Sequence, residues 1–197
     1  MSQFIGQQAP DFAATAVMPD NSVKDGFKLS DFRGKYVVMF FYPLDFTFVC
    51  PTEIIEFNRK LKEFAARDVQ VIGVSIDSQF SHLAWKNTPV DQGGIGQVQF
   101  PLVADLTKQI SRDYGVLLDD KIALRGTFLI DKAGVIQHMV VNNLGLGRNI
   151  DEALRMVDAL QHLEKHGELC PAGWTKGEEA MSPNAKGVAS YLAKHGH

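Results

Sequence analysis

Two cysteines are the residues of this sequence with the most distinctive chemistry, because a thiolate can attack electrophiles and then be oxidised and reduced again. Cys50 lies in "FYPLDFTFVCPTE", residues 41–53, and Cys170 lies in "GELCPAGW", residues 167–174. The chain has no third cysteine. Since a free cysteine is more often a buried apolar filler than a reactive group, the residues around each one must show whether it is placed to react.

The residues around Cys50 form a strand, a turn and the start of a helix. The strand is predicted at 35–43 and the amphipathic helix at 54–65, and Pro51 suits a first helical turn because its missing N–H costs little there. The dipole at a helix start stabilises a sulfur anion, and Thr47 brings a hydroxyl to the same place. From these features alone, a buried apolar filler and a reactive thiol are about equally favoured interpretations of Cys50.

The elements that position these residues alternate between strands and helices. Three stretches rich in Val, Ile and Phe predict buried strands at 35–43, 69–77 and 126–141, and the turn "DKAG" makes the last one a hairpin. Helices are predicted at 54–65, 78–87, 106–115 and 149–167. This order predicts an α/β domain with a thioredoxin-like fold, in which helices flank a central mixed β-sheet.

The composition indicates one globular domain followed by a short extension. A chain of 197 residues with 45% hydrophobic residues can bury a single core. After Gly167 the apolar clusters become short and are separated by Gly, Pro and charged residues. We therefore predict a domain at 1–167 and a C-terminal extension at 168–197 that carries Cys170.

Charge and hydropathy exclude several classes of function. The net charge is −3 and the basic residues are scattered, which disfavours nucleic acid as a partner, and no apolar run is long enough for a membrane span. The N-terminal residues resemble neither a secretory nor a transit peptide, so a cytoplasmic protein with free thiols is expected. The six histidines show no metal-ligand spacing with the cysteines, and His195 and His197 read as a solvated end.

The stretch "PLDFTFVCPTE" resembles the peroxiredoxin active-site motif Pro-x-x-x-Thr-x-x-Cys, with Pro43, Thr47 and Cys50 in register. The likeness extends over nearly the whole chain, through "APDFAATAV", "GVSIDSQFSHLAWKN", "LRGTFLIDKAGVIQ" and "GELCPAGW". It identifies the chain as similar to the typical 2-Cys peroxiredoxins, which include bacterial alkyl hydroperoxide reductase C and the eukaryotic thioredoxin peroxidases. The resemblance implies a thiol peroxidase that reduces hydrogen peroxide and organic hydroperoxides, with Pro43 shielding the pocket.

The resemblance also implies a role for each residue around Cys50. Cys50 is the expected peroxidatic cysteine, which attacks the peroxide and becomes a sulfenic acid. Arg125 supplies a fixed charge to the sulfur and the peroxide, and Thr47 donates a hydrogen bond to them. Glu53 and Arg148 orient Arg125. Without the family, Arg125 reads as a surface charge at a strand end.

The resemblance makes Cys170 the resolving cysteine, although on its own a cysteine beside Pro171 in a tail reads as incidental. The family implies a homodimer in which a Cys50–Cys170 disulfide links the two protomers, commonly assembled into a decameric ring. The disulfide is then reduced by thioredoxin or a dedicated flavoprotein reductase, and no bound cofactor is expected. Because a disulfide needs Cα atoms within about 7 Å, the helix start at Cys50 must unwind locally.

Two further segments resemble elements of peroxiredoxins that excess peroxide overoxidises easily. "GGIG" at 93–96 and the pair Tyr191 and Leu192 each depart from the family pattern by one residue, at Ile95 and Leu192. We expect the tail to pack over the helix that begins near Cys50 and to slow its unwinding. The alternative is a glycine-rich turn and an ordinary helix.

Two other functions fit parts of the sequence. A redox-regulated chaperone or peroxide sensor on the same oligomer is the alternative to the peroxidase. A disulfide reductase on this fold is disfavoured, because it needs a Cys-x-x-Cys pair and the chain has Glu53 where the second cysteine belongs.

Overall fold

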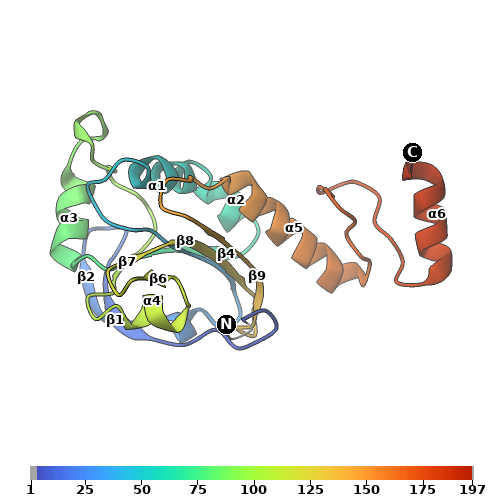
Figure 1. Ribbon diagram of the computed structural model, residues 1–197, viewed down its shortest axis with the longest axis horizontal. Helices are drawn as coiled ribbons and strands as arrows, with labels where there is room; N and C mark the ends of the chain where they lie inside the picture. Colours follow the sequence, from blue (N-terminus) through green and yellow to red (C-terminus); the bar gives the residue numbers. More distant parts are fainter. Residues whose placement is uncertain (1–3, 197) are drawn as a thin grey trace. The chain divides into compact units, whose positions relative to one another are not determined.

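The computed structural model describes residues 4–196, so that His197 lies outside the described residues (Figure 1). The chain forms two compact units, one ending at Ile150 and one beginning at Asp151. The predicted division at residue 167 follows the composition and stays a prediction. Among the described residues, no helix has the length and apolar character needed to cross a membrane.

The first unit is built on a seven-stranded mixed sheet in the order β2-β1-β5-β4-β3-β8-β9. The central strands β3, β4 and β5 run parallel, whereas β8 pairs antiparallel with β3 and forms a hairpin with β9. This arrangement confirms the predicted parallel β-α-β start and the later hairpin. The strands are β1 (Ala13–Val17), β2 (Val23–Lys28), β3 (Tyr36–Phe41), β4 (Val69–Ser75), β5 (Leu102–Ala104), β8 (Arg125–Ile130) and β9 (Ile136–Asn142), with a separate pair β6 (Leu117–Leu118) and β7 (Ile122–Ala123).

The helices follow the prediction with two differences. The helix predicted at 54–65 begins earlier, at Cys50 itself, and is interrupted at Lys60, where ψ is 5°. The helix predicted at 106–115 shrinks to Gln109–Asp113, because Lys108 adopts a left-handed conformation with φ of 59°. The helices are α1 (Cys50–Arg59), α2 (Leu61–Ala65), α3 (Gln79–Asn87), α4 (Gln109–Asp113), α5 (Ile150–His166) and α6 (Ala185–His195), with 3₁₀ turns η1 (Leu29–Phe32) and η2 (Val90–Gln92).

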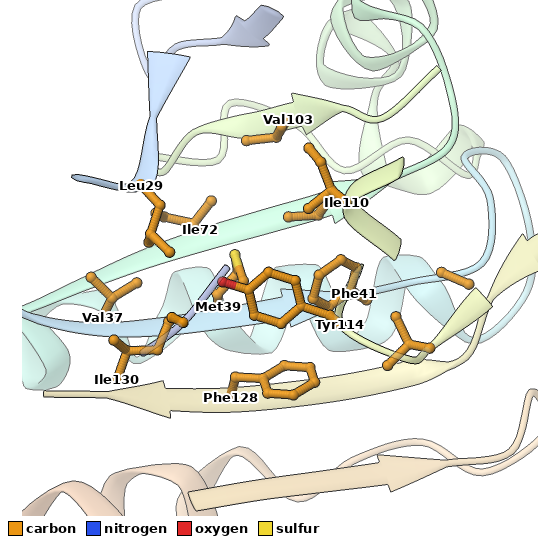
Figure 2. Packing of buried hydrophobic residues seen from close by; sticks show 14 of the residues in the cluster. Leu29, Val37, Met39, Phe41, Ile72, Val103, Ile110, Tyr114, Phe128 and Ile130 are labelled. Carbon is orange, nitrogen blue, oxygen red and sulfur yellow. The ribbon is translucent and has the colours of Figure 1, made fainter. Parts of the chain in front are cut away.

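Both faces of β3 are buried, which fixes the strand that leads to Cys50. Phe41 packs on one face against Tyr114, next to α4, with ring centroids 5.3 Å apart (Figure 2). On the other face Phe40 stacks on Phe57 of α1 at 4.2 Å. Figure 1 shows α1 and α2 on one side of the sheet and α4 on the other. An apolar strand held on both faces provides a rigid base for the segment that follows it.

Candidate active site

Cys50 is the first residue of α1, at the junction with the segment that leaves β3. Its side chain is fully buried, and Pro51 follows it in the first helical turn, as predicted. A proline is tolerated there because the first N–H groups of a helix have no partner within the helix. The thiol therefore occupies the positive end of the α1 dipole.

Thr47 shares its hydroxyl between two acceptors. Its Oγ1 lies 3.0 Å from Cys50 Sγ and 2.8 Å from the carbonyl oxygen of Leu44. A hydroxyl carries one proton, so it can donate to only one of these atoms at a time. When Cys50 is a thiol, Thr47 donates to Leu44 and accepts from the S–H group; when the sulfur is an anion, the hydroxyl can turn and donate to it.

Arg125, the first residue of β8, brings a guanidinium group to the sulfur. Its Nη1 lies 3.4 Å from Cys50 Sγ and donates to Glu53 Oε2 at 2.7 Å. Its Nε donates to the carbonyl oxygen of Leu144 at 2.8 Å. Arg125 is buried, so the prediction from the sequence without the family resemblance, a surface charge at a strand end, is wrong. The contacts on both sides hold the guanidinium in one orientation.

Glu53 and Arg148 form a buried pair behind Arg125. Arg148 donates to both Glu53 carboxylate oxygens, from Nε at 2.9 Å and from Nη2 at 2.8 Å, and its backbone N–H adds a third bond. Its Nη1 donates to the carbonyl oxygens of Phe41 and Gly126. Burial raises the pKa of Glu53, but the hydrogen bonds and charge of Arg148, together with the charge of Arg125, outweigh it and hold that pKa below its usual value.

The charges of this cluster balance only when the sulfur is an anion. Arg125 and Arg148 contribute two positive charges, and Glu53 contributes one negative charge. All three side chains are buried, where an uncompensated charge is costly. A thiolate at Cys50 supplies the missing negative charge, which is the form that attacks a peroxide.

Sequence reasoning missed a second buried network, which anchors the segment between β3 and Cys50. Asp45 accepts a hydrogen bond from Tyr42 at 2.9 Å and pairs with His82 of α3 at 2.8 Å. Its backbone N–H donates to Asp77 at 2.8 Å. Burial, and then the charge of Asp45, raise the pKa values of both Tyr42 and Asp77. A signal was available at Asp45, which interrupts a largely apolar stretch, but sequence spacing does not show that it meets His82.

The structure brings together most of the predicted site residues. Thr47, Glu53, Arg125 and Arg148 form one connected set of contacts with Cys50. Pro43 is buried in the segment between β3 and α1, and its shielding role stays a prediction.

Cys170 belongs to the second unit and is half-buried, with Sγ 3.6 Å from the carbonyl oxygen of Ala159. Burial raises the pKa of Cys170; the charge of Arg155 lowers it and that of Glu168 raises it further. The buried cluster around Cys50 and the thiol of Cys170 therefore lie in different units. Within residues 4–196, no three His, Cys, Asp or Glu side chains converge as metal ligands.

Comparisons with known proteins agree with this geometry. Residues 5–139 match the AhpC/TSA family, and residues 159–194 match the C-terminal domain of 1-Cys peroxiredoxin, although that match contains a second cysteine, Cys170. Alkyl hydroperoxide reductase C of Helicobacter pylori strain J99 is 60% identical over 188 residues, with 95% of each chain covered, and mouse peroxiredoxin-2 is 55% identical over 192 residues, with 97% of this chain and 96% of the relative covered.

A solved structure extends the comparison to the fold. The reduced 2-Cys peroxiredoxin of Plasmodium vivax superposes with a TM-score of 0.96 at 51% identity, covering 98% of this chain and all of the other. Because the likeness covers 98% of this chain, it includes the segments around Cys50 and Cys170. The chain belongs to the AhpC/TSA family of peroxiredoxins and is a thiol peroxidase that reduces peroxides.

Proposed function

We propose that Cys50 is the peroxidatic cysteine and that Thr47 and Arg125 act directly on the reacting atoms. The observation that carries this proposal is the buried sulfur within 3.0 Å of a hydroxyl and 3.4 Å of a guanidinium nitrogen. The thiolate attacks one peroxide oxygen, the S–O bond forms as the O–O bond breaks, and the leaving oxygen takes a proton to become water or an alcohol. Cys50 is left as a sulfenic acid.

Arg125 and Thr47 act on the charge that develops in this step. As the O–O bond breaks, negative charge moves from the sulfur to the departing oxygen, and donors that are already oriented stabilise it without rearranging. Glu53 and Arg148 position Arg125 through the bonds described above, and they do not touch the reacting atoms. Pro43 keeps water out of the pocket.

We further propose that Cys170 resolves the sulfenic acid. Its thiolate attacks the Cys50 sulfur, an S–S bond forms, and hydroxide leaves and is protonated to water. The family likeness supports a disulfide between the two protomers of a homodimer that assembles into a decameric ring. An external dithiol, thioredoxin or a dedicated flavoprotein reductase, then returns both thiols, and hydrogen peroxide and alkyl hydroperoxides are the substrates. We place this cycle in the cytoplasm.

The test is stopped-flow peroxide consumption with thioredoxin as the reductant. Cys50→Ser should abolish the fast reaction with peroxide. Cys170→Ser should keep that first reaction and lose both the intermolecular disulfide and turnover with thioredoxin. A fast phase that survives Cys50→Ser overturns the peroxidatic role, and a thioredoxin-reducible dimer in Cys170→Ser overturns the resolving role.

A further inference from the structure

A short loop follows β9 and leads to Arg148. It consists of residues 143–147, which we call the arginine loop, and it contains Gly145 and Gly147. Its residues other than Leu144 are exposed, and Leu146 exposes 63% of its surface. Burial therefore contributes little to the conformation of this loop, which depends mainly on its hydrogen bonds.

The arginine loop reaches both arginines of the active site. In its middle, the carbonyl oxygen of Leu144 accepts the 2.8 Å bond from Arg125 Nε. At its end, the backbone N–H of Arg148 donates to Glu53 Oε1 at 2.9 Å, beside the bonds that the Arg148 side chain makes to the same carboxylate. A displacement of this loop would therefore move the anchor of Arg125 directly and that of Glu53 as well.

Asn142, the last residue of β9, closes the arginine loop. Its Nδ2 lies 3.2 Å from the carbonyl oxygen of Leu146 and 3.4 Å from that of Gly147. The amide group carries two protons, so this side chain can donate to both carbonyls. Asn142 is also the residue opposite Arg125 in the ladder between β8 and β9. Its side chain thus ties the far end of the loop to the strand position beside Arg125.

The bonds within the arginine loop have a different role. The Oδ1 of Asn143 accepts from the backbone N–H of Leu144 at 2.8 Å, and the backbone N–H of Leu146 donates to the Asn143 carbonyl oxygen at 3.0 Å. These bonds connect neighbouring residues, so they shape the turn. The bonds of Asn142 instead attach the far end of the turn to β9.

We propose that Asn142 is a positioning residue for Arg125, because it closes the arginine loop and so fixes the Leu144 carbonyl that orients the guanidinium. The inference rests on the role proposed for Arg125 in peroxide reduction. Arg125 is anchored at Nη1 by Glu53 and at Nε by Leu144. If the second anchor is loose, the group keeps its charge and its pair with Glu53. It can then turn away from the orientation that stabilises the departing oxygen.

The rate constant of the reduced protein with hydrogen peroxide measures this effect. Asn142→Leu keeps the branched shape of the side chain and removes its N–H donors. Water can replace them, because Leu146 and Gly147 are exposed. We expect the rate constant at pH 7 to fall about tenfold, since a small misplacement of a group that acts on the transition state is enough for such a loss. Rapid quenching and intact-protein mass spectrometry follow the oxidation of Cys50.

Asn58→Leu is the matched control. Asn58 is another half-buried asparagine whose amide bonds to distant backbone, since its Oδ1 accepts from the N–H of Gln99 at 2.8 Å. It lies near the end of α1 that is remote from Cys50. The control should lower the urea midpoint, as Asn142→Leu does, and should leave the rate constant within about twofold of the parent. An equal loss of rate in the two variants overturns the proposal. Asn142→Ala is a second route if Asn142→Leu folds poorly, and it should give the same tenfold loss.

A double variant separates the positioning of Arg125 from a general loosening of the site. Arg125→Lys removes the Nε donor, so that closure of the loop has no guanidinium left to orient. In that background Asn142→Leu should change the rate constant by less than about twofold, whereas effects that pass through other groups would add in full. A tenfold loss in both backgrounds overturns the positioning role.

The same set of variants distinguishes this role from the proposed function. If Arg125→Lys alone leaves the rate constant unchanged, the role proposed for Arg125 fails and the positioning role of Asn142 fails with it. If Arg125→Lys lowers the rate constant and Asn142→Leu does not, the positioning role fails alone.

Discussion

The two cysteines of this chain lie in opposite kinds of environment. Cys50 is fully buried against the Thr47 hydroxyl and the Arg125 guanidinium, and Glu53, itself bound by Arg148, holds that guanidinium. Cys170 is half-buried in a surface loop, has one weak contact to a carbonyl oxygen, and has a raised pKa. The first site is organised before the substrate arrives, and the second holds its thiol in a less reactive form.

This difference agrees with the roles proposed for the two sulfurs. An attack on a small peroxide gains from donors that are fixed in advance, since they need no reorganisation during the reaction. A resolving thiol must travel to its target, so strong contacts in its resting position would slow it. Substitutions in the Cys50 cluster should therefore have large effects, and substitutions in the C-terminal unit should have small ones.

Glu53→Gln gives the largest expected effect, because it leaves two buried guanidinium groups without their counterion. We expect the free energy of unfolding at pH 7 to fall by about 3 kcal/mol, as for other buried pairs that lose one partner. The pKa of Glu53 is lower in the folded chain than its ordinary value of 4.5. Its contribution is therefore complete above pH 4.5 and is lost as the pH falls through the lowered folded value, so the two proteins should converge in acid.

Urea unfolding across that pH range measures the effect, and Glu56→Gln is the matched control. Glu56 lies on the same helix and pairs with Arg59, but its side chain is 37% exposed. Its substitution should change the free energy of unfolding by less than about 0.5 kcal/mol. Equal losses in the two variants would mean that the Glu53 cluster is no more rigidly built than the surface.

Arg125→Lys tests whether the orientation of the charge matters as well as its presence. Lysine keeps a positive charge but lacks the fork that contacts Cys50 and Glu53 together. We expect the rate constant of Cys50 with hydrogen peroxide to fall about 100-fold, the loss typical of a misplaced charge-stabilising donor. Arg112→Lys, on α4 and 48% exposed, should leave the rate unchanged, and an unchanged rate in Arg125→Lys would remove the case for prearranged donors.

Much of the first unit could be predicted from the sequence because its signals are local. The apolar runs of β3 and β4 and the turn between β8 and β9 lie where expected, since each is buried or has characteristic turn residues. The outer strands β1 and β2 were missed, because much of their surface is exposed and the apolar pattern is weak. β5 is too short to show any period, and the short apolar clusters of the tail indicate a helix at α6 only as the alternative interpretation.

The residues of the active site also divide into those that a local sequence pattern predicts and those that it does not. Cys50, Thr47 and Glu53 are close in sequence, so one motif contains them, whereas Arg125 and Arg148 needed the family resemblance to be connected with it. The bond from Arg125 to the Leu144 carbonyl and the Asp45 network depend on contacts between distant segments. Such contacts are set by tertiary packing, and no local pattern encodes them.

Removing the residues after Gly187 should give the smallest effect and tests the C-terminal unit directly. α6 exposes Leu192 (54%) and Val188 (38%), an apolar face that suits the predicted packing over the helix that begins at Cys50. Loss of about 1 kcal/mol of apolar burial should speed the unwinding of that helix about fivefold. The peroxide concentration that half-inactivates the enzyme during turnover with thioredoxin should then rise by about the same factor.

Leu192→Ala tests the predicted apolar packing, and Ser190→Ala on the same exposed helix is its control. The first should reproduce part of the resistance and the second none of it. In "GGIG" the Gly93 carbonyl oxygen accepts a hydrogen bond from the Trp85 indole N–H at 2.9 Å, and the Ile95 backbone N–H donates to the Trp85 carbonyl oxygen at 3.3 Å. The loop therefore has a structural role whether or not the tail controls unwinding. If truncation leaves the sensitivity to peroxide unchanged, the ordinary-helix interpretation of the tail is correct.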